Sequence, residues 1–295
     1  MAMVRIEAPA SSANLGPGFD TLGIALNVYN TFETELSETD ILENCDERYN
    51  NANNLFLQAY RKGCEAIGVN DHVRVRFACD IPASRGMGSS AAFIAAGVSA
   101  ASVLHENALS KEEIFQIATQ MEGHPDNIAP CIYGGLIASL KALDNTWIHR
   151  SLAIHDSWIF TQLIPDFEVD TKKARAALPD FYSRAEASAS VANAILNVYA
   201  LGNGDLELLK EAGRDVIHEP YRAPLIKGFE DVREVAESDT GGKLLISGSG
   251  PSCLLISKKP LSKEAGMRIA AVNGDWKVMA LNIAPNGLLV NGKPL

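Results

Sequence analysis

The spacing of apolar and polar residues predicts alternating strands and helices along the chain. Residues 4–8 alternate like a half-buried strand, and a second apolar run covers residues 22–28 after a loop rich in Ser, Asn, Gly and Pro. Residues 54–67 have helical spacing that ends at Gly68, and residues 73–79 alternate as a strand. The first part of the chain is therefore expected to combine a sheet with helices.

The second part of the chain continues in the same manner. Ser110 and Glu113 have the spacing of a capping box, which predicts a helix from there to Met121. Another helix is expected from Thr171, which can act as its N-cap. The remaining elements are expected as strands at 158–164, 253–257 and 276–283, as a strand running into a glycine turn at 244–251, and as a helix at 261–274.

The composition is that of a globular chain with a full core. Of the 295 residues, 47% are hydrophobic and 21% are charged, which separates this sequence from disordered and fibrous proteins. The pattern is interrupted most clearly at Asp144, Asn145 and Thr146. The length fits one large domain or two modest ones, and a division into residues 1–150 and 151–295 would fall at this interruption.

The charge of the chain limits its partners. A net charge of −10 and a pI near 5.1 argue against nucleic acid and acidic membranes, which require clustered Lys and Arg. Seven acidic residues and no basic residue between 33 and 47 indicate a solvated edge or loop rather than a metal site. Five scattered cysteines without a Cys-x-x-Cys pair predict neither a disulfide framework nor a zinc site. Without a signal-like or spanning apolar stretch, a cytoplasmic location is expected.

The most informative stretch is residues 80–92, Asp-Ile-Pro-Ala-Ser-Arg-Gly-Met-Gly-Ser-Ser-Ala-Ala, between a predicted strand and a strongly helical run. The first amides of a helix lack internal partners, and the helix dipole adds partial positive charge there. Glycines allow a phosphate to approach the backbone closely. Ser89 and Ser90 add hydroxyls for phosphate oxygens or for phosphate-bound Mg²⁺. The stretch therefore predicts an anion cradle.

The residues of this loop leave other interpretations open. No lysine follows the glycines, so the spacing of the usual P-loop is absent. Gly86, Gly88 and Ala91 match a dinucleotide fingerprint, but the second strand and acidic residue that the fingerprint requires do not follow. Glycine before an alanine-rich helix can also serve close packing alone.

Three separated motifs stand in order along the chain. They are residues 9–20, Pro-Ala-Ser-Ser-Ala-Asn-Leu-Gly-Pro-Gly-Phe-Asp, the loop at 82–92, and residues 247–252, Ser-Gly-Ser-Gly-Pro-Ser. Together they resemble the signature motifs of the GHMP small-molecule kinases. The first motif and the segment 122–127, Glu-Gly-His-Pro-Asp-Asn, resemble the homoserine kinase branch in particular.

The resemblance implies an α+β fold of two domains. The N-terminal domain is expected to be an ATP-binding α/β domain with a left-handed crossover, and the C-terminal domain to be ferredoxin-like. The resemblance also implies phosphoryl transfer from MgATP to the side-chain hydroxyl of L-homoserine, giving O-phospho-L-homoserine for threonine biosynthesis. A homodimer is expected because relatives commonly form one.

The resemblance also assigns roles to residues around the cradle. It implies that ATP contacts the whole loop: Pro82, Ala83, Ser84, Arg85, Gly86, Met87, Gly88, Ser89, Ser90, Ala91 and Ala92. Ser90 and Glu122 are the expected Mg²⁺ ligands, because hydroxyl and carboxylate oxygens suit this ion. Some relatives carry the glutamate earlier in the preceding helix, where this chain has Gln116.

An amino-acid substrate presents a carboxylate, an ammonium and a hydroxyl, each of which needs a partner. By resemblance, Arg175 and Arg222 bind the carboxylate, and Asp20 and Asn127 are the catalytic residues. The expected substrate-binding set is completed by Asn14, His124, Thr171 and Gly248. The remaining histidines, His218 among them, have no metal-site spacing and are expected to be structural. Asn53 or Asn54 could contact the nucleotide or cap a helix.

The sequence leaves the proton acceptor open. Several relatives place an aspartate near the accepting hydroxyl, whereas this chain has Asn127, which cannot accept a proton at neutral pH. Asp126 is adjacent, although neighbouring side chains need not face the same way. We hypothesise that no strong general base operates and that the proton leaves late to phosphate or water.

Three alternatives differ from this interpretation. A mevalonate-type kinase would share the glycine loop but not the first motif or the two arginines. A non-catalytic ligand sensor on the same fold is disfavoured by the presence of Ser90 and Glu122. An NAD-dependent dehydrogenase is disfavoured because its second strand and acidic residue do not follow the loop.

Overall fold

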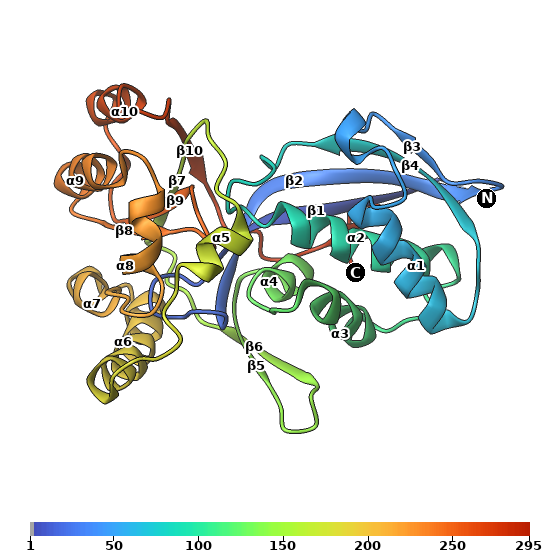
Figure 1. The fold of residues 1–295 in the computed structure, drawn as a ribbon, viewed down its shortest axis with the longest axis horizontal. Helices are drawn as coiled ribbons and strands as arrows, with labels where there is room; N and C mark the ends of the chain where they lie inside the picture. Colours follow the sequence, from blue (N-terminus) through green and yellow to red (C-terminus); the bar gives the residue numbers. More distant parts are fainter. Residues whose placement is uncertain (1–2) are drawn as a thin grey trace.

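The computed structural model describes residues 3–295 and has two lobes, each built on one sheet (Figure 1). The larger sheet has eight strands in the order β12-β11-β1-β2-β4-β3, with β5 paired to β2 and β6 paired to β5. These strands are β1 (Val4–Ala13), β2 (Leu22–Ser37), β3 (Ile41–Glu43), β4 (His72–Cys79), β5 (Leu136–Lys141), β6 (Trp147–Leu152), β11 (Leu289–Val290) and β12 (Lys293–Pro294).

The helices of the first lobe lie together on one side of this sheet (Figure 1). They are α1 (Leu55–Ile67), α2 (Ser89–Leu104), α3 (Lys111–Glu122) and α4 (Ile128–Tyr133), with a short 3₁₀ helix at Glu47–Tyr49. α2 contacts α1, α3, α4 and β1, and its small alanine side chains allow this central position. Within residues 3–295, no helix is both long and apolar enough to cross a membrane.

The second lobe contains an antiparallel sheet in the order β10-β7-β9-β8. Its strands are β7 (Ile159–Ile164), β8 (Lys243–Ile246), β9 (Cys253–Ser257) and β10 (Lys277–Leu281). Its helices are α5 (Thr171–Ala176), α6 (Arg184–Asn203), α7 (Leu206–Ala212), α8 (Glu219–Arg222), α9 (Phe229–Thr240) and α10 (Lys263–Ala270), with a 3₁₀ helix at Ala223–Leu225. The elements of this lobe follow the order strand, helices, two strands, helix, strand. This is the ferredoxin-like order that the family resemblance implied.

The end of the chain returns to the first lobe. β11 pairs with β1 and β12 pairs with β11, so these two short strands form one edge of the larger sheet. β3 and β4 are the one parallel pair among the described strands, and α1 connects them. The division at residue 150 and the left-handed crossover both stay predictions.

The structure corrects two expected helix boundaries. α5 is capped by Asp170, whose carboxylate accepts from the amide of Lys173 at 2.9 Å, and Thr171 is already the first helical residue. A carboxylate is also favoured over a hydroxyl by the positive end of the helix dipole. α10 is shorter than residues 261–274, because Ser262 caps it and it ends at Ala270.

The acidic segment of residues 33–47, expected as a solvated edge or loop, includes the edge strand of the larger sheet. Its first part belongs to β2 and three of its residues form β3, the edge strand of the sheet. Arg76 of β4 pairs with Glu43 at 2.9 Å and with Glu33 at 3.5 Å, and Arg74 pairs with Glu35 at 3.3 Å. The segment itself contains no basic residue, and strand pairing places the arginines of β4 beside its carboxylates.

Candidate active site

Backbone hydrogen bonds join three distant loops where the two lobes meet. The amide of Ser11 donates to the carbonyl of Met87 over 3.1 Å, which connects the first motif to the glycine loop. The amide of Gly248, in the turn between β8 and β9, donates to the carbonyl of Ala13 over 3.1 Å. The three sequence motifs therefore form one continuous structure.

The glycine loop leads into a helix end without a cap. Gly88 is the N-cap of α2 with a φ of +69°, and no side chain caps the helix. The amides of Ser89, Ser90 and Ala91 have no carbonyl acceptor within residues 3–295. A Cβ at Gly88 would lie 2.0 Å from the Oγ of Ser11, so glycine is required here on both conformational and steric grounds. The open helix end offers donors and partial positive charge to an anion.

A cavity of about 370 Å³ lies against this helix end. All of the predicted substrate residues line it: Asn14, Asp20, His124, Asn127, Thr171, Arg175, Arg222 and Gly248. Residues 83–90 and Glu122 line it as well. Pro82, Ala91 and Ala92 do not, and the side chains of the two alanines are fully buried in the core. The structure thus places the expected ATP-binding loop and the expected substrate residues around one cavity. Of the loop, only residues 83–90 face that cavity.

Ser90 and Glu122 meet across two helix ends. Ser90 lies in the first turn of α2, Glu122 is the last residue of α3, and the Oγ of Ser90 donates to the Oε2 of Glu122 at 2.8 Å. Burial raises the pKa of the Glu122 carboxyl, so a bound cation would relieve the cost of its charge. A hydroxyl and a carboxylate are hard oxygen donors, and their residues fit Mg²⁺.

Gln116, the alternative position for the metal-binding glutamate, does not line the cavity. Its amide donates to Glu112 at 2.6 Å and to the carbonyl of Trp147 at 2.7 Å. No group of three or more His, Cys, Asp or Glu side chains in residues 3–295 could hold a metal alone. A cation between Ser90 and Glu122 would therefore complete its shell with phosphate oxygens and water.

His124, Asp126 and Asn127 form a polar cluster on the cavity wall. The Nδ1 of His124 lies 2.8 Å from the Oδ1 of Asp126, and the Nδ2 of Asn127 lies 3.4 Å from the same oxygen. Burial disfavours the imidazolium, but the hydrogen bond and charge of Asp126 outweigh it and raise the pKa of His124. Ser11 fixes Asn127 by donating to its Oδ1 at 2.8 Å. A Cβ at Gly23 would lie 1.7 Å from the carbonyl oxygen of Asp126, so β2 passes directly against this cluster.

Asp20 and Arg175, expected to bind opposite ends of the substrate, bind each other. Two hydrogen bonds of 2.9 Å join the guanidinium to the carboxylate. The ring of Phe19 lies below both arginines, 5.5 Å from the guanidinium carbon of Arg175 and 5.3 Å from that of Arg222. Phe19 thereby makes a cation–π contact with both arginines.

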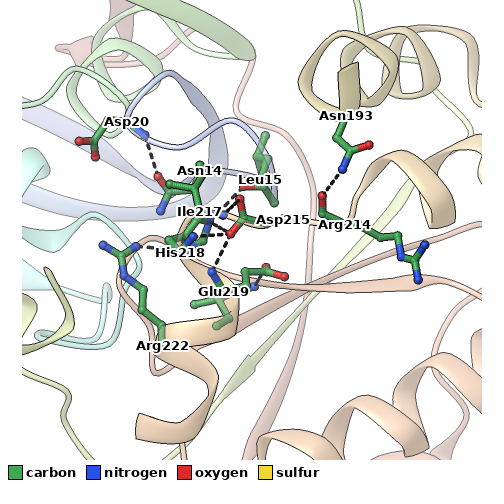
Figure 2. A network of polar contacts seen from close by, with 12 residues as sticks. Asn14, Leu15, Asp20, Asn193, Arg214, Asp215, Ile217, His218, Glu219 and Arg222 are labelled. Atoms are coloured by element: carbon green, nitrogen blue, oxygen red, sulfur yellow. Dashed lines mark hydrogen bonds and ion pairs between the residues drawn. The ribbon is translucent and has the colours of Figure 1, made fainter. Parts of the chain in front are cut away.

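Arg222 is the most deeply buried cation of the site, with 2% of its surface exposed. Its Nη1 donates to the carbonyl of Gly248 at 3.0 Å, the same carbonyl to which Asn14 donates at 2.8 Å. The Nδ1 of His218 lies 3.3 Å from this Nη1, and Figure 2 shows the two side chains meeting beside the first motif. The Nη2 makes no hydrogen bond within the described residues, so its donors remain for a ligand.

Comparisons with known proteins place the chain. The family model for the GHMP kinases N terminal domain matches residues 54–135, and that for GHMP kinases C terminal matches residues 197–270. The homoserine kinase of Clostridium botulinum (strain Langeland / NCTC 10281 / Type F) is 38% identical over 299 residues, covering 99% of this chain and 100% of that relative. The chain belongs to the GHMP kinase family. It is therefore an ATP-dependent kinase that phosphorylates a hydroxyl group, which excludes the dehydrogenase and sensor alternatives.

Solved structures place the fold in the same family. The homoserine kinase from Cytophaga hutchinsonii ATCC 33406 superposes with a TM-score of 0.86 at 30% identity, over 98% of each chain. The mevalonate kinase of L. major in complex with R-mevalonate gives a TM-score of 0.70 at 14% identity, over 95% of this chain and 96% of that one. At that identity the second match shows a shared GHMP kinase fold alone.

Several cavity residues of this GHMP kinase were not assigned from its sequence. Tyr49, Leu55 and Phe93 line the cavity with apolar surface. Tyr49 belongs to a 3₁₀ turn at the end of the acidic segment, and no sequence motif there indicates a binding side chain. Asn53 and Asn54, which could have been either contacts or caps, both line the cavity, and Asn54 also caps α1. Asn54 is therefore both a helix cap and a residue of the cavity wall.

The α8 segment that carries Arg222 leads to a prediction about pH. Burial raises the pKa of Glu219 to about 8, although its carboxyl accepts from the amide of Ile246 at 2.7 Å. The folded state holds this proton more tightly than the unfolded chain, whose glutamate titrates near 4.5. The stability that protonated Glu219 confers is complete below pH 4.5 and is lost as the pH rises through 8.

Glu219→Gln should remove this dependence. Relative to the parent chain, we expect the free energy of unfolding of the variant to gain roughly 3 kcal/mol between pH 5 and pH 8. Urea unfolding of both chains at several pH values measures the difference. A constant difference between the two chains over that range would contradict the prediction.

Proposed function

We propose that this GHMP kinase transfers the γ-phosphoryl group of ATP to the side-chain hydroxyl of L-homoserine and releases O-phospho-L-homoserine. The observation that carries the proposal is that Asp20, Arg175 and Arg222 line the same cavity as the uncapped end of α2. A zwitterionic amino acid needs a carboxylate for its ammonium and cations for its carboxylate. The homoserine kinase relatives support the choice of acceptor.

The phosphates of ATP would bind at the free amides of residues 89–91, where glycine allows close approach. Ser90 and Glu122 would hold Mg²⁺, which neutralises phosphate charge when it is bound. The chain itself would align the acceptor hydroxyl with the phosphate within the cavity that both sets of residues line. Phosphoryl transfer needs this positioning more than covalent chemistry from the protein.

The acceptor would exchange partners with the ion pair of Asp20 and Arg175. Its ammonium would bind Asp20 and its carboxylate would bind Arg175 and the free Nη2 of Arg222. Asn127, held by Ser11, would orient the hydroxyl. The substrate thus replaces one internal ion pair with two, so desolvation of its charges is compensated on both sides.

We further propose that no strong general base operates. One oxygen of Asp126 is already used by His124 and Asn127, and Asn127 is an amide. Asp126→Asn is therefore expected to lower kcat by less than about tenfold, whereas loss of a general base costs about 10²–10⁴-fold. Steady-state kinetics at saturating ATP and acceptor give the answer. A fall of several orders of magnitude in a folded variant would make Asp126 the base.

The proposed function is tested by ADP release with L-homoserine, mevalonate, L-serine and no acceptor. We expect turnover with L-homoserine well above that with the other three. Activity with mevalonate alone would replace the proposed acceptor, and turnover with none of these alcohols would reject it. The homodimer stays a prediction, which mass measurement in solution can decide.

A further inference from the structure

His218 is a buried titratable residue that the proposed chemistry does not use. Its side chain has no exposed surface, and it is the N-cap residue of α8, one helical turn before Arg222. Figure 2 shows its imidazole between the loop of the first motif and the guanidinium of Arg222. From the sequence alone it had no expected role beyond structure.

The two neighbours of the ring fix its tautomer. The Nε2 lies 3.0 Å from the carbonyl oxygen of Gly16, which can only accept a hydrogen bond, so Nε2 carries the proton. The Nδ1 lies 3.3 Å from the Nη1 of Arg222, which can only donate, so Nδ1 is the acceptor. One neutral imidazole therefore satisfies both contacts. Burial lowers the pKa of His218, and the charge of Arg222 adds to this against the opposing charge of Asp215.

The backbone around His218 is also fixed. The carboxylate of Asp215 accepts from the amide of Ile217 at 3.1 Å, that of His218 at 2.6 Å and that of Glu219 at 2.7 Å. The ring of Phe19 stacks on the imidazole at 5.5 Å with an angle of 28° between the planes. The imidazole thus has little freedom to turn away from Arg222.

We propose that His218 is a positioning residue: its Nδ1 accepts from Arg222 and holds the guanidinium so that Nη2 faces the carboxylate of the acceptor. Gly16 sets the tautomer through the other ring nitrogen, while Asp215 and Phe19 fix the place of the residue. The inference rests on the proposed function only in requiring an acceptor that bears a carboxylate. It predicts an effect on acceptor binding, because His218 itself does not line the cavity.

Two substitutions separate the ring nitrogens. In His218→Asn the side-chain oxygen occupies the place of Nδ1 and keeps an acceptor for Arg222, while the contact with Gly16 is lost. In His218→Gln the terminal amide nitrogen occupies the place of Nε2 and keeps the donor for Gly16, while the acceptor for Arg222 is lost. A merely structural histidine would show loss of function in step with loss of thermal stability in both variants.

We expect His218→Gln to raise KM for the acceptor about five- to thirtyfold, with kcat and the KM for ATP within about twofold of the parent. His218→Asn should raise the same KM by about threefold or less, even where its melting temperature is lower. Equal KM values in the two variants would overturn the proposal. The proposal also requires that His218→Gln no longer raises KM for the acceptor when Arg222 has been replaced by Met. An equally large increase in KM in the Arg222→Met background would overturn it.

Two controls keep this test separate from the proposed function. The parent chain is first assayed with L-homoserine and mevalonate, and the variants are compared on the carboxylate-bearing alcohol that it accepts. If the parent chain does not turn over L-homoserine, the proposed acceptor is rejected, and the proposal for His218 is still tested on the other carboxylate-bearing alcohol. Independently of activity, nitrogen NMR of the parent should show His218 as the Nε2–H tautomer at pH 7.5, and an Nδ1–H or doubly protonated ring would overturn the inference.

Discussion

Glu122→Gln is expected to lower kcat by about a hundredfold to a thousandfold while the fold persists. Glutamine keeps the shape of the side chain, and its amide oxygen can still accept from the Oγ of Ser90. What is lost is the negative charge of the carboxylate that, with Ser90, would hold Mg²⁺. Removal of one preorganised electrostatic group from a reaction site has effects of about this size.

The dependence of kcat on Mg²⁺ concentration identifies the cause. The Mg²⁺ concentration at half-maximal rate should rise in Glu122→Gln together with the fall in kcat. Glu112→Gln is a matched control, because Glu112 lies on the same helix and pairs with Gln116 and Tyr133 outside the cavity. If Glu122→Gln leaves both kcat and the Mg²⁺ dependence unchanged, Glu122 does not hold the ion.

The parts of the site that could be predicted from the residues themselves are those set by local chemistry, whereas the substrate-binding side chains were assigned from the family resemblance. Gly88 precedes an alanine-rich helix, so the uncapped helix end could be expected from neighbouring residues alone. The capping box at Ser110 likewise predicted the start of α3, the helix that ends at Glu122. The fold followed from family motifs, since strand alternation alone would not have given the order of either sheet.

The parts that the sequence did not predict depend on distant residues. The pairing of Asp20 with Arg175 joins side chains 155 positions apart, and nothing local to either indicates it. The role of Phe19 below both arginines requires the two lobes to be placed together. The four-residue spacing of His218 and Arg222 was visible in the sequence. The ring tautomer was not, because it depends on the carbonyl of Gly16.

Arg222→Met should raise KM for L-homoserine by about a hundredfold to a thousandfold, with a smaller effect on kcat and none beyond about twofold on the KM for ATP. The guanidinium is almost fully buried, so methionine would leave the substrate carboxylate in a poorly hydrated place without its partner. An unpaired buried charge of this kind costs about 3–5 kcal/mol, part of which the remaining Arg175 would offset.

Arg175→Met supplies the matched comparison for Arg222. The side chain of Arg175 is 45% exposed and its ion pair with Asp20 is open to solvent, so its loss should raise the same KM only about tenfold. Arg222→Lys tests geometry, since an ammonium keeps the charge but cannot reach Gly248, His218 and a ligand from one planar group. If Arg222→Met and Arg175→Met have equal effects, burial does not set the strength of carboxylate binding. If Arg222→Met lowers kcat alone, Arg222 acts on the transferring phosphate instead of the acceptor.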